Sequence, residues 1–139
     1  MTLTAFIAKW LNRYCDFDQK WSSQCMDLMR QFIQYSIKKP AYSIPASTYA
    51  KDAFKRFPDA GNRDYLKIKN SPTNSPISGD IIFWNGFVAG ITGVAGHVAI
   101  VTKADVNQFE VFNQNWPIHA PCTIKRFSYR GVLGWLRAK

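Results

Sequence analysis

The pattern of apolar and polar residues divides the chain into a helical first half and a strand-rich second half. Apolar residues recur at helical spacing in three stretches, which predicts helices over residues 2–13, 23–38 and 46–57. From Asp80 onward they gather in short runs separated by turn residues, which predicts consecutive strands in an antiparallel sheet. The expected strands cover residues 65–69, 80–84, 97–103, 108–115, 124–129 and 132–137. Helices followed by strands predict an α+β fold, with N-terminal helices packed on a C-terminal antiparallel β-sheet.

The length and hydrophobic content of the chain suffice for one domain. A chain of 139 residues, 47% of them hydrophobic, can bury a real core but is too short for two ordinary domains. We therefore expect residues 1–139 to form a single domain. No run of about 18 apolar residues occurs, so we expect no membrane-spanning helix. The first residues lack the basic start and the small-residue cleavage site of a signal peptide.

The chain carries a formal net charge of +9, and its basic residues are scattered. A charge of this sign attracts polyanionic partners, such as nucleic acid or an anionic bacterial envelope. The sequence contains no recognisable nucleic-acid-binding motif, which argues against nucleic acid. One hypothesis is nevertheless a basic module that binds a wall polymer or nucleic acid without catalysis.

Cys25 stands at the expected start of the second helix, just after the good N-cap residues Ser22 and Ser23. The positive end of the helix dipole favours a thiolate over a thiol, so this position suits a nucleophile. The alternative is that Cys25 is a small buried hydrophobe. The three cysteines imply no disulfide framework, and we expect Cys15 and Cys122 to be structural or free thiols.

His97 opens one of the expected strands, directly after Gly96, which lets the backbone approach another element closely. A neighbouring antiparallel strand can bring His97 beside Asn113 or Asn115, and a helix packed on the sheet can bring Cys25 beside them. Cysteine, histidine and a polar orienting residue, in this chain order, are the arrangement of papain-like cysteine hydrolases. Each of these residues could instead be structural.

Four segments of the chain resemble the signature segments of the CHAP domain, a family of cysteine, histidine-dependent amidohydrolases or peptidases. They are QCMDL at 24–28, SGDIIFW at 78–84, GHVAIV at 96–101 and FNQNWP at 112–117. The family occurs largely in bacteriophage endolysins and bacterial cell-wall hydrolases. The resemblance implies a papain-like α+β fold, a single catalytic domain over residues 1–139 without a separate cell-wall-binding domain, and hydrolysis of amide bonds in peptidoglycan.

The resemblance also implies roles for individual residues. Cys25 is the expected nucleophile and His97 the expected general base. The third position falls on Asn113, where many phage members have Glu. An Asn can orient the imidazole but stabilises an imidazolium less than a carboxylate does. Asn115 matches an additional active-site Asn of the family.

Three further residues or groups are expected to contact the substrate. The backbone N–H of Cys25, with the Gln24 side chain or Asn115, would hold the oxyanion of the tetrahedral intermediate. Trp116 directly follows the site motif and is the favoured groove residue among the aromatic candidates. The other candidates are Phe87, Trp84 and Trp135, and we expect Trp10, Trp84 and Trp135 to lie in the core.

An acidic loop precedes Cys25 and is a candidate calcium site. Its alternate positions Asp16, Asp18, Lys20 and Ser22, together with Asp27, are spaced as oxygen ligands of Ca²⁺ require. Lys20 could supply only its backbone carbonyl, and Ser22 a carbonyl or its hydroxyl. The loop resembles the EF-hand-like calcium site of some phage CHAP endolysins. The alternative is that Asp16 and Asp18 cap the loop and that Asp27, in the first turn of the helix, interacts with the positive end of the helix dipole.

The resemblance predicts bacterial peptidoglycan as the partner, with anionic teichoic acids as a further attraction for the basic surface. We expect a monomer that binds neither nucleic acid nor a membrane. The protein would be phage-encoded, made in the host cytoplasm and acting on the cell wall, or extracellular. N-acetylmuramoyl-L-alanine amidase and peptidoglycan endopeptidase both fit the sequence, as does an NlpC-type cysteine hydrolase.

Overall fold

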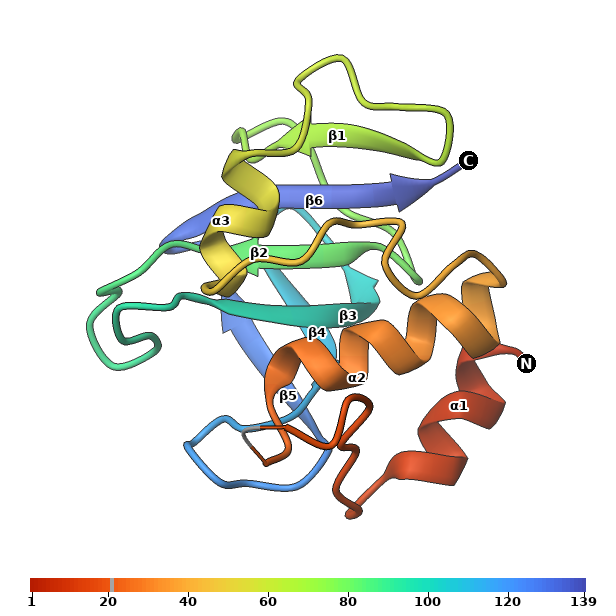
Figure 1. The fold of residues 1–139 in the computed structure, drawn as a ribbon. Coiled ribbons are helices and arrows are strands. Elements are labelled where there is room, and N and C mark those ends of the chain that lie inside the picture. The colour runs from red at the N-terminus through yellow and green to blue at the C-terminus, as the bar shows by residue number, and fades with distance from the viewer. Residues whose placement is uncertain (21) are drawn as a thin grey trace.

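The computed structural model describes residues 1–20 and 22–139, and it has the α+β architecture that the sequence predicts (Figure 1). The helical elements are α1 (Leu3–Trp10), α2 (Cys25–Phe32), the π-helical turn η1 (Ile33–Ile37) and α3 (Ala50–Lys55). The strands are β1 (Tyr65–Lys69), β2 (Ile81–Trp84), β3 (His97–Ala104), β4 (Gln108–Asn113), β5 (Thr123–Ser128) and β6 (Val132–Ala138). Helices precede strands along the chain, as expected.

All six strands form one antiparallel sheet in the order β1-β6-β2-β3-β4-β5. The last strand, β6, therefore lies between β1 and β2. Trp84 at the end of β2 pairs with His97 at the start of β3, and residues 85–96 connect them as a loop. This end of the sheet faces the N-terminus of α2, which crosses in front of β3 in Figure 1.

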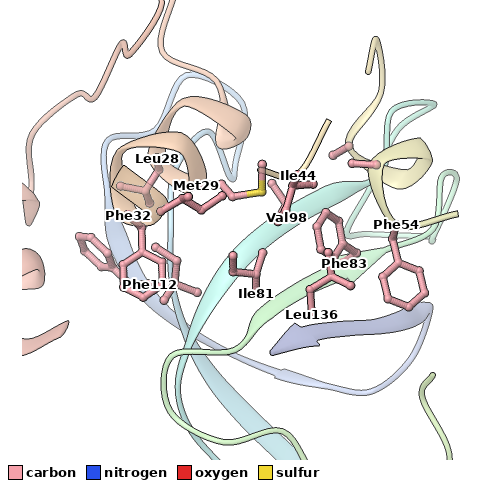
Figure 2. Close-up of a cluster of buried hydrophobic side chains, with 14 of the residues drawn as sticks. Leu28, Met29, Phe32, Ile44, Phe54, Ile81, Phe83, Val98, Phe112 and Leu136 are labelled. Carbon is pink, nitrogen blue, oxygen red and sulfur yellow. The ribbon is translucent and has the colours of Figure 1, made fainter. Parts of the chain in front are cut away.

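The main core lies between the helices and one face of the sheet. Figure 2 shows Met29 and Phe32 of α2 pointing to the sheet, Met29 toward Val98 of β3 and Phe32 toward Phe112 of β4, all of them buried. A second apolar cluster covers the other face of the sheet and contains the fully buried Trp84 and Trp135. The expectation that Trp84 and Trp135 are core residues is therefore confirmed.

The helices are shorter than the apolar pattern predicts. Thr2 caps α1 as expected, but the helix ends at Trp10 because Leu11 turns to an extended backbone and Asn12 then donates to the carbonyl of Cys122 at 2.9 Å. The N-cap of α2 is Gln24, so the expectation of Ser22 or Ser23 at this position is wrong. In the part of the chain that the structure describes, no helix has the length and apolar character needed to cross a membrane.

Candidate active site

Cys25 is the first residue of α2 and lies on the wall of a groove of about 620 Å³. The loop before α2, the first turn of α2, and Ser47, Thr48, Ala50 and Ala95 form the rest of this wall. The start of α2 is fixed by a capping interaction in which the backbone N–H of Gln24 donates to Oδ2 of Asp27 at 2.8 Å. Cys25 is therefore partly exposed at the groove wall.

The structure brings Cys25 to the start of β3. Its sulfur interacts with the backbone N–H of Val98, the residue after His97, and with that of Met26. Both interactions favour the thiolate, but burial outweighs them and raises the pKa of Cys25 to about 11. Desolvation of the charged sulfur thus opposes the stabilisation by nearby N–H groups from which the preference for a thiolate was expected.

His97 is buried at the same end of the sheet, with 4% of its surface exposed. Its ring lies 5.3 Å from that of Trp84, and a side chain at Gly96 would collide with the Trp84 carbonyl, which confirms the expected close approach. Burial lowers the pKa of His97 to about 4, so the imidazole is neutral at pH 7. Cys25 and His97 consequently rest as a thiol and a neutral base.

Asn113 ends β4 and lies beside His97, as the strand order predicts. Its side chain raises the pKa of His97 and so partly opposes the effect of burial. Within residues 1–20 and 22–139, Nε2 of His97 and Oδ1 of Asn113 are both buried and make no close hydrogen bond. The amide oxygen is thus available to accept from an imidazole N–H.

The structure reveals a further residue, Gln114, that the sequence patterns did not single out. Gln114 is completely buried, and its Oε1 accepts from the backbone N–H of Cys15 at 2.6 Å. Its Nε2 donates to the carbonyl oxygens of Cys15 and Gln24, at 2.8 Å each. One side chain therefore attaches the end of β4 to the loop before α2. Its position between the two asparagines of the FNQNWP segment was the available signal.

Asn115 also connects the two halves of the site. It lies beyond the end of β4 with a left-handed backbone (φ 65°). Its Nδ2 donates to Oε1 of Gln24 at 3.1 Å, and its Oδ1 accepts from the N–H of His119 at 2.6 Å. Asn115 and Gln24 are therefore adjacent at the N-terminus of α2.

Trp116 is partly buried, with its ring 4.9 Å from that of Phe127, and its Nε1 donates to the carbonyl of Ile91 at 2.9 Å. These contacts join the turn after β4 to the loop between β2 and β3. A substrate contact of Trp116 stays a prediction.

Two carboxylates of the acidic loop converge with that of Asp27 in the first turn of α2. One oxygen from each of Asp16, Asp18 and Asp27 lies within 4.8 Å of the other two. Burial and the two neighbouring aspartates raise the pKa of Asp27 to about 6. Oδ1 of Asp16 is buried and has no hydrogen-bond partner among the described residues, which fits a group that awaits a cation. These hard oxygen donors suit a divalent cation such as Ca²⁺.

The other two expected ligands lie in the same loop. The backbone N–H of Lys20 donates to Oδ1 of Asp18 at 2.9 Å, and Ser22 has a left-handed backbone with φ 57°. Contributions of their carbonyl oxygens to a metal site stay predictions.

The sequence of the chain is similar to one known protein family and to a phage endolysin. The CHAP domain profile matches residues 14–115. Endolysin PlyTW of Staphylococcus phage Twort (strain DSM 17442 / HER 48) is 29% identical over 142 residues, which cover 96% of this chain and 28% of the relative.

Two crystal structures share the fold. Wild-type endolysin LysIME-EF1 superposes with a TM-score of 0.72 at 22% identity, over 96% of this chain and 61% of that one. Ly7917 superposes with a TM-score of 0.56 at 17% identity, over 83% of this chain and 53% of that one. The chain thus spans less than two thirds of each of these three proteins. Because the profile covers most of its length, including Cys25, His97, Asn113 and Asn115, the chain belongs to the CHAP domain family.

Proposed function

We propose that this protein is a peptidoglycan hydrolase of the endolysin type, with residues 1–139 as a single catalytic domain. The observation that carries the proposal is Cys25 on the wall of a groove, with its sulfur at the backbone N–H of Val98, the residue after the buried His97. Asn113 adjoins His97. The relationship to an endolysin supports the bacterial wall as the substrate. The reaction is hydrolysis of a wall amide bond, as an N-acetylmuramoyl-L-alanine amidase or a peptidoglycan endopeptidase.

The resting protonation states determine the first step. Because burial disfavours both the thiolate and the imidazolium, His97 takes the Cys25 proton as the sulfur attacks the amide carbonyl carbon. The carbonyl π electrons move to oxygen and form a tetrahedral oxyanion. The backbone N–H of Cys25, with the side chain of Gln24 or Asn115, stabilises this charge.

Proton return completes the cycle. Protonated His97 gives its proton to the amide nitrogen as the C–N bond breaks, which leaves a thioester on Cys25 and releases the amine. His97 then takes a proton from a water molecule as the oxygen of that water attacks the thioester carbon. Collapse of the second intermediate expels the Cys25 sulfur, which recovers the proton, and the carboxylic acid leaves. Asn113 orients the imidazole and favours its charged form.

The three carboxylates would hold a structural Ca²⁺. Asp16, Asp18 and Asp27 are the side-chain donors, with carbonyl oxygens of Lys20 and Ser22 as further ligands. A bound cation supplies positive charge that offsets the mutual repulsion of the three carboxylates. This would hold the loop in the conformation that positions Cys25.

Peptidoglycan is the proposed partner, and the net charge of +9 would add attraction to anionic teichoic acids. We propose a monomer that is phage-encoded, made in the host cytoplasm and active on the wall, or extracellular. It would act without binding nucleic acid or a membrane.

The function can be tested by mass spectrometry of purified Gram-positive peptidoglycan after digestion. Wild-type protein should release new termini, and Cys25→Ala should release none. Cys122→Ala removes a thiol outside the groove and should retain the products. Free L-alanine N-termini would identify an amidase, and new termini in the stem or cross-bridge an endopeptidase. If the wild type binds the wall without releasing products, the basic binding module is the correct function.

A further inference from the structure

Three residues form an aromatic and cationic corner next to the groove: Tyr49, Lys51 and Phe87. Nζ of Lys51 lies 5.5 Å from the ring centroid of Tyr49 and 5.9 Å from that of Phe87. The Phe87 side chain is 75% exposed, although burial of such a ring is favourable. Lys51 forms no ion pair within the described ranges. The corner thus presents a flat apolar ring to solvent beside the half-buried Lys51, whose ammonium has no carboxylate partner among the described residues.

Hydrogen bonds hold Phe87 in this exposed position. Its backbone is left-handed, with φ 58°, an unfavourable conformation for a bulky residue. Its N–H donates to the carbonyl of Gly93 at 2.9 Å, and Oγ1 of Thr92 donates to the carbonyl of Asn85 at 2.7 Å. Nζ of Lys55 donates to Oδ1 of Asn85 at 3.0 Å, which ties the loop to α3. The fold therefore directs this ring outward, and strained backbone of this kind is concentrated at functional sites.

The corner adjoins the groove that contains Cys25. Ala50 and Ala95 both line the groove, and Lys51, the residue after Ala50, donates its backbone N–H to the Ala95 carbonyl at 3.0 Å. Ala50 and Ala95 consequently place the corner at the rim of the groove. An extended substrate that leaves the groove on the side of Ala50 and Ala95 would pass over this rim.

We propose that the corner binds a sugar ring of the peptidoglycan glycan strand. The proposal rests on the peptidoglycan hydrolase function given above. A pyranose presents C–H groups on one face, which pack on a flat aromatic ring, and hydroxyl and acetamido oxygens at its edge. Phe87 provides the ring, and the Lys51 ammonium provides hydrogen-bond donors for those oxygens. A binding site for a phosphate polymer would need the cation but not the exposed ring, so the pair favours a sugar.

The test uses a neutral N-acetylglucosamine tetrasaccharide as the probe, titrated into the protein while backbone amide NMR signals are followed. Signals of residues 49–51 and 85–96 should shift on binding to the wild type. Phe87→Ala should weaken binding about tenfold, as expected for loss of one central aromatic contact, and Phe87→Trp should retain it. Val106→Ala is the matched control, because Val106 is 57% exposed at the opposite end of β3. Lys51→Gln should weaken binding less than Phe87→Ala does.

Each outcome separates the subsite from the catalytic function. Equal sugar binding by the wild type and Phe87→Ala, or no binding by the wild type, would overturn the subsite even if the wild type digests peptidoglycan. Sugar binding that depends on Phe87, together with no digestion, would support the subsite and refute hydrolysis. If the tetrasaccharide fails to bind but a soluble teichoic acid binds in a salt-sensitive, Lys51-dependent manner, the corner is an anion site instead.

Discussion

The side-chain amide of Gln114 donates a hydrogen bond of 2.8 Å to the backbone carbonyl of Gln24, the residue that precedes Cys25. The same amide group holds both backbone polar groups of Cys15. Since Asn113 is the neighbour of Gln114, this buried side chain, together with the hydrogen bond between Asn115 and Gln24, sets the distance between the two halves of the site. Gln114 therefore positions the loop before Cys25 relative to the end of β4, a role that the surrounding sequence does not indicate.

Replacement of Gln114 with Leu should reduce both stability and activity. The change leaves the N–H and the carbonyl of Cys15 unpaired in the interior and removes one of two donors to the Gln24 carbonyl, so the free energy of unfolding should fall by about 2–4 kcal/mol. Urea unfolding measures this loss. Gln108→Leu, on the exposed first position of β4, is the control and should change stability by less than about 0.5 kcal/mol. Equal stability of the two variants would contradict the assigned role of Gln114.

The buried His97 should make stability depend on pH. Its folded pKa of about 4 lies below the usual value of 6.5, so the neutral form stabilises the fold above pH 6.5. As the pH falls toward 4, the unfolded chain binds a proton that the folded chain does not, and this stability is lost. The drop between pH 7.5 and 4.5 should be about 2 kcal/mol smaller in His97→Gln than in the wild type.

Comparison of the two proteins is necessary because Asp27 acts in the opposite direction. Its pKa is raised to about 6, so its contribution to stability increases as the pH falls. This contribution is common to the wild type and His97→Gln and cancels in the difference. Identical pH profiles for both proteins would show that His97 titrates normally.

Asn113→Ala should lower the rate of hydrolysis more than the affinity for the wall. Loss of the amide oxygen leaves the imidazole unoriented, so we expect kcat to fall about 100-fold with little change in KM. Steady-state hydrolysis of soluble wall fragments distinguishes the two constants. A melting temperature measured in parallel identifies any loss that unfolding explains. A change confined to KM would instead assign Asn113 to substrate binding.

Calcium should raise the melting temperature, and excess EDTA should lower it. A cation that binds only the folded protein stabilises it by about 2.7 kcal/mol at 100 times its Kd. Asp18→Asn removes one of the three clustered carboxylates and should abolish most of the calcium response. Asp59→Asn alters an exposed carboxylate outside this cluster and should leave the response intact. A response equal in both variants would place the calcium elsewhere.

Lysis of bacterial walls should slow as the salt concentration rises. The screening length falls from about 10 Å at 0.1 M to about 3 Å at 1 M, which removes attraction between exposed basic residues and wall polyanions. Turbidity assays over this range, with hydrolysis of a neutral soluble fragment as the control, separate attraction from catalysis. Lysis that is independent of salt would exclude a role for the net charge.

The sequence predicted the strands more accurately than the helices. The predicted strands agree with the observed ones where short apolar runs are separated by turn residues, as in β2 and β3, which pair with each other in the sheet. The first helix ends three residues earlier than its apolar spacing predicts, because Asn12 bonds instead to Cys122, far away in the chain. Apolar spacing reports which residues face the core and contains no information on such distant hydrogen bonds.

The composition of the site was predictable, but its electrostatics were not. Residue order and the strand pattern predicted Cys25 and His97 beside Asn113 or Asn115, and the resemblance to the CHAP domain selected Asn113. The protonation state of Cys25 depended on how completely the packed structure removes water from its sulfur, which a linear pattern does not specify. Gln114 was missed for a related reason, since the buried carbonyls that it satisfies are known only once the fold is known.

The place of β6 in the sheet has a consequence for synthesis of the protein. A ribosome makes Cys25 and His97 long before residues 132–138, yet β1 can join the sheet only through β6. The nascent chain therefore carries an incomplete sheet until its last strand emerges. Chains interrupted before that point would leave β1 without a partner strand and the edge of β2 unpaired.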